Sequence, residues 1–240
     1  MKKNCIVDTF DSELLGQTVA KVWLEKEESR NIFLELDAFF IEEQIGLVFC
    51  FAPFDASLAF FLKDYGYYPV SSQASYRLLK KESFFYPMTE NYQMKNYEYS
   101  EQDQFLAEIV KELALISHYG KDPLIDQNKA VALYKKWIKN TFDGYAHKIF
   151  TAVDGQENCI GLLSLRLVDE ELCIDLLGVH SQWRKNGIAA QLVQQAISYA
   201  YEQKKSLIVK TQGENIPANR FYQKYNFVLE KLDLVYHKKM

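Results

Sequence analysis

The stretch from Leu172 to Gln203 constrains the fold most, because it predicts a strand, a tight turn and a helix in immediate succession. LCIDLLGV, Leu172 to Val179, is an apolar run of strand length. A basic turn with one glycine, Arg184 to Ala189, then leads into a helix with apolar residues at three- and four-residue steps. Such a helix start directs unpaired backbone N–H groups at one point, which can bind phosphate. Taken alone, R-x-x-G-x-A is a weak motif, and an ordinary strand-to-helix turn is the commoner interpretation.

A second motif follows at once. Ser206 to Gln212 (SLIVKTQ) predicts another strand, and Asn215 is a natural N-cap for the helix after it. Asn226, which tolerates the left-handed conformation, marks the end of that helix. R-x-x-G-x-A after an L-x-V strand, followed by N-x-x-A-x-x-x-Y ending at Tyr222, resembles the GNAT superfamily of N-acetyltransferases. The order and spacing of the two motifs are far more specific than either motif alone.

The resemblance implies that acetyl-CoA binds at the turn, with its pantetheine arm between the splayed strands 172–179 and 206–211. The implied cofactor-binding residues are Leu177, Val179, Arg184, Lys185, Asn186, Gly187, Ile188, Ala189, Ala190, Asn215 and Tyr222. Tyr222 stands at the motif position of the family's general acid, and a phenol can donate a proton because it stays protonated at pH 7. The alternative is a core aromatic beside Phe221. Asp175, alone in an apolar strand, is the candidate base, with an ion pair as the equal alternative. His118 and His180 are further candidates for the base, whereas His147 and His237 are expected at the surface.

The rest of the chain predicts an α/β (α+β) protein with a GNAT acyl-CoA N-acyltransferase fold. Residues 91–240 carry its order of elements around a mixed central sheet: a strand at 92–99, helices at 100–116 and 127–140, and antiparallel strands from 148. Ser117 to Asp126 is expected to be a polar loop. Residues 1–90 predict a smaller, degenerate half-GNAT α/β domain, and Lys80 to Asn91, interrupted by Pro87, is the expected linker.

The first domain repeats the last one when the sequence is shifted by 160 positions. Helix 30–44 falls on 190–204, strand 46–51 falls on 206–211, and Asp55 falls on Asn215. The first copy has no phosphate turn and has Leu62 in place of Tyr222. We therefore expect it to be structural or substrate-binding, and not a second acetyl-CoA site.

The whole chain resembles the nucleotide-sugar N-acetyltransferases of surface-polysaccharide and lipopolysaccharide synthesis, such as those acting on dTDP-4-amino-4,6-dideoxygalactose (dTDP-fucosamine). The resemblance rests on S-x-Y at 117–119, Y-x-x-W-I at 134–138, S-L-R at 164–166 and T-Q-G-x-N at 211–215. It implies that a nucleotide sugar contacts His118, Tyr119 and Arg166. His118 stands where relatives commonly have Arg, which grips phosphate better than His does. For Arg166, a structural carboxylate such as Asp175 is an equal alternative partner, and Trp137 is expected to pack in the core.

Composition excludes several classes of function. The net charge of −4 over 240 residues argues against a nucleic-acid binder, and no apolar run is long enough to cross a membrane. Four cysteines without C-x-x-C spacing predict buried free thiols, no metal and a cytoplasmic protein. The acceptor could instead be another amine: a peptide N-terminus, an antibiotic or a polyamine. A non-catalytic acyl-CoA-binding protein is the alternative function, and a homodimer is possible.

Overall fold

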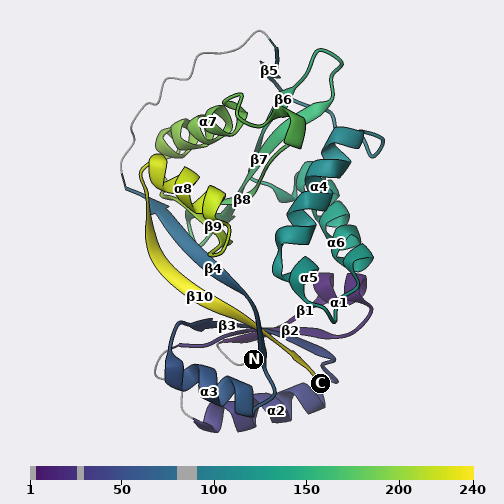
Figure 1. Ribbon diagram of the computed structural model, residues 1–240, viewed down its shortest axis with the longest axis vertical. Coiled ribbons are helices and arrows are strands. Elements are labelled where there is room, and N and C mark those ends of the chain that lie inside the picture. The colour runs from purple at the N-terminus through teal and green to yellow at the C-terminus, as the bar shows by residue number, and fades with distance from the viewer. Residues whose placement is uncertain (1–3, 26–29, 80–90) are drawn as a thin grey trace.

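The computed structural model describes residues 4–25, 30–79 and 91–240. The strands in these residues form one mixed sheet in the order β1-β2-β3-β10-β4-β9-β8-β7-β6-β5 (Figure 1). The strands are β1 (Cys5–Asp8), β2 (Val19–Trp23), β3 (Leu47–Pro53), β4 (Tyr68–Leu78), β5 (Gln93–Met94), β6 (Lys148–Val153), β7 (Cys159–Val168), β8 (Glu171–Val179), β9 (Leu207–Gln212) and β10 (Phe227–Lys239).

Helices cover both faces of this sheet. They are α1 (Thr9–Leu15), α2 (Arg30–Glu42), α3 (Ala56–Asp64), α4 (Gln104–Ile116), α5 (His118–Lys121), α6 (Gln127–Asn140), α7 (Ile188–Glu202) and α8 (Ile216–Lys224). A π-helical turn, Thr141–Tyr145, follows α6, and a 3-10 turn, Ser181–Trp183, precedes α7.

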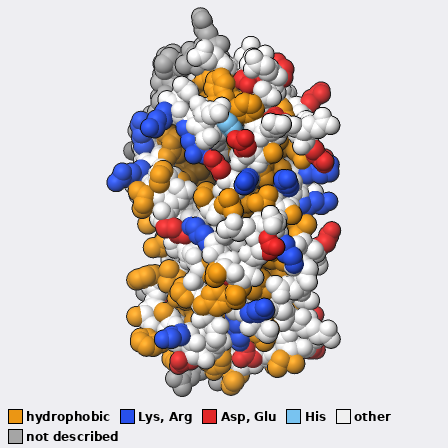
Figure 2. Space-filling view, turned by 45° about the vertical axis from the view of Figure 1, so that its right-hand side comes forward, with side chains coloured by type: hydrophobic (Ala, Val, Ile, Leu, Met, Phe, Trp, Pro, Cys, Tyr) orange, Lys and Arg blue, Asp and Glu red, His pale blue; other side chains and the backbone are white. Residues whose placement is uncertain are grey.

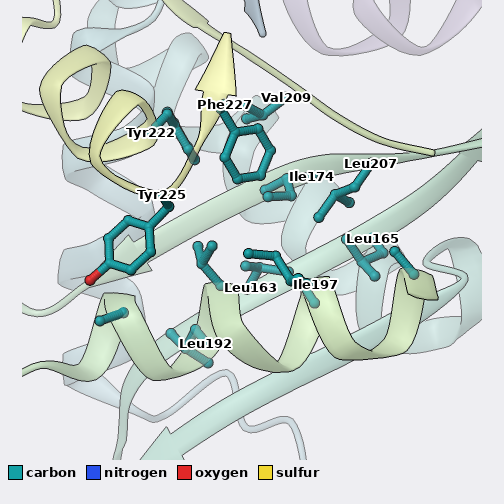
Figure 3. Close-up of a cluster of buried hydrophobic side chains, with 14 of the residues drawn as sticks. Leu163, Leu165, Ile174, Leu192, Ile197, Leu207, Val209, Tyr222, Tyr225 and Phe227 are labelled. Carbon is teal, nitrogen blue, oxygen red and sulfur yellow. The ribbon is translucent and has the colours of Figure 1, made fainter. Parts of the chain in front are cut away.

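Three apolar clusters hold the helices to the sheet. α7 and α8 pack on one face of β7, β8 and β9, as Figure 3 shows for Leu192 and Ile197 of α7 facing Leu163, Leu165 and Ile174. Helices α1, α4, α5 and α6 form a second layer on the opposite face, which extends to Phe49 of β3. The third cluster joins α2 and α3 to β2, β3 and β10.

Most of the predicted elements are confirmed, with their caps. Asp55, Asp103 and Asn215 each accept a hydrogen bond from a backbone N–H in the first turn of α3, α4 and α8, at 3.0, 3.0 and 3.2 Å. Asn226 has the expected left-handed φ of 61°. The strand expected over 92–99 is wrong, because only Gln93–Met94 pair with β6. The loop expected to be polar contains α5 and buries Ser117, Tyr119 and Asp122. The expected linker at 80–90 lies outside the described residues.

The two halves exchange their last strands. β3 and α3 coincide with β9 and α8 at the predicted shift, with Leu47 against Leu207 and Asp55 against Asn215. Yet β3 pairs with β10 of the second half, while β9 pairs with β4 of the first half. The long strands β4 and β10 pair with each other and join the upper and lower parts of the molecule (Figure 1). The second half is therefore built around a strand that the first half supplies.

Candidate active site

The central feature of the site is an opening between β8 and β9. These parallel strands pair only from Leu172 opposite Leu207 to Ile174 opposite Val209. Beyond that point β9 stays paired with β4 as far as Gln212, and β8 stays paired with β7 as far as Val179. A cavity of about 1030 Å³ lies here, lined by residues of both strands and of α4, α7 and α8. In the first half, β2 and β3 remain paired from Val19 to Trp23.

A bulge in β8 helps to open the strands and places Asp175. Ser164 pairs with Leu176 and Leu165 pairs with Ile174, so that Asp175 is the extra residue. One oxygen of Asp175 lies 3.2 Å from Arg166 Nε, and the other accepts a hydrogen bond of 3.0 Å from Trp137 Nε1. Burial raises the pKa of Asp175 above its usual value, although Arg166 and Trp137 oppose the shift. Asp175 lines the cavity, whereas Arg166 and Trp137 hold it from behind.

The turn before α7 presents free backbone N–H groups to the cavity. Lys185 and Gly187 have φ values of 66° and 82°, which curl the backbone. Among the described residues no side chain caps α7, and its first backbone bond runs from Gln191 N–H to Gly187 O at 3.0 Å. The N–H groups of residues 188–190 thus have no acceptor within the helix. Arg184 donates to Val179 O at 3.1 Å and pairs with Glu112, so its charge is partly neutralised.

Tyr222 lies in the wall of this cavity, one helical turn after Asn219 on α8. Its side chain is 4% exposed, and its ring packs 5.5 Å from the rings of Phe221 and Phe227. Figure 3 shows Tyr222 together with Phe227 and Val209 at the α8 end of the apolar cluster. Burial raises the pKa of Tyr222 above its usual value and the nearby Cys173 raises it further, so the hydroxyl keeps its proton at neutral pH.

The cavity is also lined by an ion pair between Lys121 of α5 and Glu214 of the β9–α8 turn. The Glu214 carboxylate also accepts hydrogen bonds from the hydroxyls of Ser71 and Ser72, both at 2.6 Å. Burial by itself raises the pKa of Glu214, but these donors, Lys121 above all, lower it to about 2. This end of the cavity thus joins α5, the β9–α8 turn and β4 of the first half.

The structure brings most of the predicted cofactor-binding residues together. Those that line the cavity are Leu177, Val179, Arg184, Lys185, Gly187, Ile188, Ala189, Ala190, Asn215 and Tyr222. Asn186 does not line it, because its carbonyl accepts a hydrogen bond from Tyr92 Oη at 3.2 Å and its amide donates to Trp183 O at 3.2 Å.

The three residues predicted to contact the substrate lie outside the cavity lining. Arg166 faces Asp175 and Tyr145. Tyr119 is 4% exposed and donates to Asp11 Oδ2 at 2.8 Å. His118 Nδ1 lies 2.9 Å from His237 Nε2. Lys121, three residues after His118, is the member of this segment that reaches the cavity.

His118 belongs to a buried polar chain between the two halves. His237 Nδ1 lies 2.5 Å from Asp122 Oδ2, which also accepts a hydrogen bond of 3.0 Å from Tyr68 Oη. The expectation that His237 lies at the surface is wrong, since its exposed fraction is 0%. Burial lowers the pKa of His118 well below its usual value, and the nearby His237 lowers it further. His147 is exposed, as expected. His180 is buried and lies 2.8 Å from Glu108.

Sequence reasoning missed Asn219, Lys121 and Glu214. Asn219 is 8% exposed and makes four hydrogen bonds that span α8, the β9–α8 turn and β4. Lys121 and Glu214 are ordinary charged residues in polar segments, and no local pattern distinguishes them. For Asn219 the available signal was a polar residue on the buried face of α8.

Neither a metal-binding cluster of side chains nor a membrane-spanning helix is found in the described part of the chain. No group of three His, Cys, Asp or Glu side chains there could hold a metal ion, and the four cysteines are buried and form no disulfide with one another. None of its helices is both long and apolar enough to span a membrane. On the face drawn in Figure 2, acidic and basic side chains are interspersed among exposed hydrophobic ones.

Comparison with known proteins gives three results. The family model "Acetyltransferase (GNAT) family" matches residues 106–227. Spore coat polysaccharide biosynthesis protein SpsD of Bacillus subtilis (strain 168) is 27% identical over 133 residues, which cover 55% of this chain and 46% of SpsD. The match therefore spans about half of that relative's length.

Solved structures share the fold. A GCN5-related N-acetyltransferase from Sphaerobacter thermophilus superposes with a TM-score of 0.68 at 14% identity, covering 98% of this chain and 76% of its own. A tandem GNAT protein from the clavulanic acid biosynthesis pathway gives a TM-score of 0.59 at 9% identity, covering 92% and 75%.

Proposed function

The chain belongs to the acetyltransferase (GNAT) family, whose members use acetyl-CoA, and on that premise we propose that it acetylates the amino group of a nucleotide-linked amino-dideoxy sugar. The observation that carries the proposal is the opening between β8 and β9 beside an uncapped helix start. A cavity of about 1030 Å³ is at the upper end of the range for small-molecule sites.

The residues around the opening fit coenzyme A. The N–H groups of residues 188–190 suit the pyrophosphate, and Gly187 keeps the backbone close to it. Leu177 and Val179 lie on the part of β8 that has separated from β9, so that edge has no strand partner and suits the amide groups of the pantetheine arm. Lys185, at the rim of the cavity, adds positive charge near the phosphates.

We propose that Tyr222 is the general acid. Its hydroxyl holds a proton at neutral pH because burial raises its pKa, and its side chain lines the cavity. A departing coenzyme A thiolate would take that proton. Because a thiol has a pKa of about 8.5, its anion is already a fair leaving group, so the help should be near the low end of ~10²–10⁴-fold.

Asp175 is the proposed acceptor of the amine's proton, directly or through a water molecule. It is the ionisable residue of the β8 bulge, and its raised pKa makes it a better base than an ordinary aspartate. Arg166 and Trp137 would keep it in place.

The acceptor sugar is proposed to enter at the end of the cavity lined by Lys121. Glu214 already accepts hydrogen bonds from Ser71, Ser72 and Lys121, so it anchors the ammonium group and has little capacity left for a ligand. A lysine ammonium has three donors, and those not used by Glu214 can bind a nucleotide phosphate. The likeness to SpsD, a spore coat polysaccharide biosynthesis protein, supports a sugar acceptor. We further propose that residues 1–90 and 91–240 are two units, of which the second binds acetyl-CoA.

A thiol-release assay with acetyl-CoA tests the proposal. dTDP-4-amino-4,6-dideoxygalactose and other amino-dideoxy nucleotide sugars would be compared with peptides, aminoglycosides and polyamines. We expect release with a nucleotide sugar and its loss on removal of the sugar's amino group. Turnover with a peptide, an aminoglycoside or a polyamine alone would refute the acceptor class. Tight binding of acetyl-CoA without turnover for any amine would indicate an acyl-CoA-binding protein.

A further inference from the structure

The turn between β9 and α8 is held together by one buried amide. Asn219 Nδ2 lies within hydrogen-bond distance of three backbone carbonyl oxygens: Gln212 O (3.0 Å), Gly213 O (2.9 Å) and Asn215 O (2.8 Å). These carbonyls belong to the last residue of β9, to the turn and to the N-cap of α8. This side chain thus ties the end of the strand, the turn and the start of the helix together.

The first half of the chain supplies the hydrogen-bond donor for the oxygen of that amide. Tyr76 of β4 donates its hydroxyl hydrogen to Asn219 Oδ1 at 2.8 Å, and Tyr76 is 3% exposed. An amide turned by 180° would direct Oδ1 at three carbonyl oxygens and Nδ2 at the tyrosine hydroxyl. The three carbonyls accept only, so they require Nδ2 at the turn, and the Tyr76 hydroxyl supplies the donor that the buried Oδ1 then needs.

The same strand holds the turn at two further points. Gly213 N–H donates to Ser72 O at 3.1 Å, and the Ser72 hydroxyl donates to Glu214 at 2.6 Å. A Cβ at Gly213 would lie 2.6 Å from Ser72 Oγ and 3.0 Å from Leu232 Cδ1, so a larger residue here would displace these side chains. Strand β4 therefore positions the segment that carries Tyr222.

We infer that Tyr76 is a positioning residue for the acetyl transfer: through Asn219 it aligns the start of α8 and so places the hydroxyl of Tyr222. The inference rests on the proposed role of Tyr222 as general acid. Asn219 precedes Tyr222 by three residues, so both lie on the same face of α8, and the rings of Tyr76 and Tyr222 are 6.3 Å apart. The first half is then part of the catalytic machinery and not only a scaffold.

The repeat offers a matched control. Tyr236 of β10 is the equivalent of Tyr76, is 4% exposed and pairs with Cys50 of β3. The position equivalent to Asn219 in the first half is Ala59, which has no amide. Tyr236→Phe therefore removes the hydroxyl of a buried tyrosine on the equivalent strand without touching the β9–α8 turn.

The experiment measures kcat and KM with acetyl-CoA and dTDP-4-amino-4,6-dideoxygalactose for Tyr76→Phe, Tyr236→Phe and Tyr76→Phe combined with Tyr222→Phe. We expect Tyr76→Phe to lower kcat about tenfold with KM for acetyl-CoA little changed, because a small misplacement of a catalytic group is costly. Tyr236→Phe should keep its kcat. In the Tyr222→Phe background, Tyr76→Phe should cost little more, because the group it positions is already gone. An equal loss in both backgrounds would overturn the inference.

Amide hydrogen exchange in the protein without ligand provides a readout that does not depend on activity. Residues 213–222 should exchange faster in Tyr76→Phe than in the wild type, and Tyr236→Phe should leave them unchanged. Unchanged exchange in Tyr76→Phe would overturn the inference even if the protein is an acetyltransferase. If the wild type acetylates no amine, the proposed function fails, and the exchange result alone decides whether Tyr76 holds the turn.

Discussion

Replacing Gly187 by valine should separate the phosphate-binding role of the turn from its role in the fold. Gly187 has φ 82° and ψ −3°, a left-handed conformation that costs an L-residue about 1–2 kcal/mol, and a β-branched residue more. An added Cβ would meet Tyr92 Oη at 3.8 Å, an ordinary contact. The cost of valine therefore comes from the backbone conformation and not from crowding.

The strain in Gly187→Val can appear in either of two measurements. If the turn keeps its shape, the free energy of unfolding falls by about 1–2 kcal/mol and the affinity for acetyl-CoA is unchanged. If the turn relaxes, the N–H groups of residues 188–190 move away from the pyrophosphate. The Kd for acetyl-CoA then rises about 5- to 30-fold, since each 1.4 kcal/mol is a factor of ten. We expect the second result, because a Cβ at Gly187 would meet only Tyr92 Oη, at 3.8 Å, so there is room for the backbone to relax there.

Calorimetric titration with acetyl-CoA and urea unfolding measure the two quantities. Gly66→Val is the control, because Gly66 has a φ of 80° and its Cβ would meet only Lys238 Cε at 4.0 Å. Gly66 follows α3 in the first half and does not line the cavity, so this variant should lose stability but keep its Kd. The reasoning is refuted if Gly187→Val changes neither quantity, or if Gly66→Val weakens acetyl-CoA binding as much.

Three further substitutions test the site. Tyr222→Phe should lower kcat about 10²-fold with little change in KM for acetyl-CoA, and steady-state kinetics that show full kcat would return Tyr222 to the core. Arg166→Ala should lower the free energy of unfolding by about 1 kcal/mol at pH 7, since the Arg166 side chain is 40% exposed and solvent screens its pair with Asp175. Unchanged stability in urea with a raised KM for the nucleotide sugar would instead place Arg166 at the substrate. Glu214→Gln should cost about 1 kcal/mol at pH 7, as a half-exposed ion pair does. Because the folded-state pKa of Glu214 is lowered from 4.5 to about 2, this loss should shrink as the pH falls through that range, and a loss that does not vary with pH in urea titrations would contradict it.

Local sequence patterns determined the elements and the cofactor side of the site. The apolar steps of α7, the Asn215 cap of α8 and the glycine in the turn all act within a few residues, so each can be found without knowing the fold. The repeat was also visible in the sequence, because the segment from β3 to α3 coincides without gaps with the segment from β9 to α8. These features place Gly187, Asn215 and Tyr222 around one cavity.

Only the tertiary structure decided which partners the polar residues have. Arg166 pairs with Asp175 because a bulge in β8 turns that carboxylate toward α6, and His237 is buried because β10 crosses into the first half. Asn219 meets Tyr76 because β4 lies beside β9, between β9 and β10. The period of side chains along a strand determines which face is buried but not which strand lies beside it. Strand exchange joins residues that are more than a hundred positions apart, and that choice depends on the packing of the whole sheet.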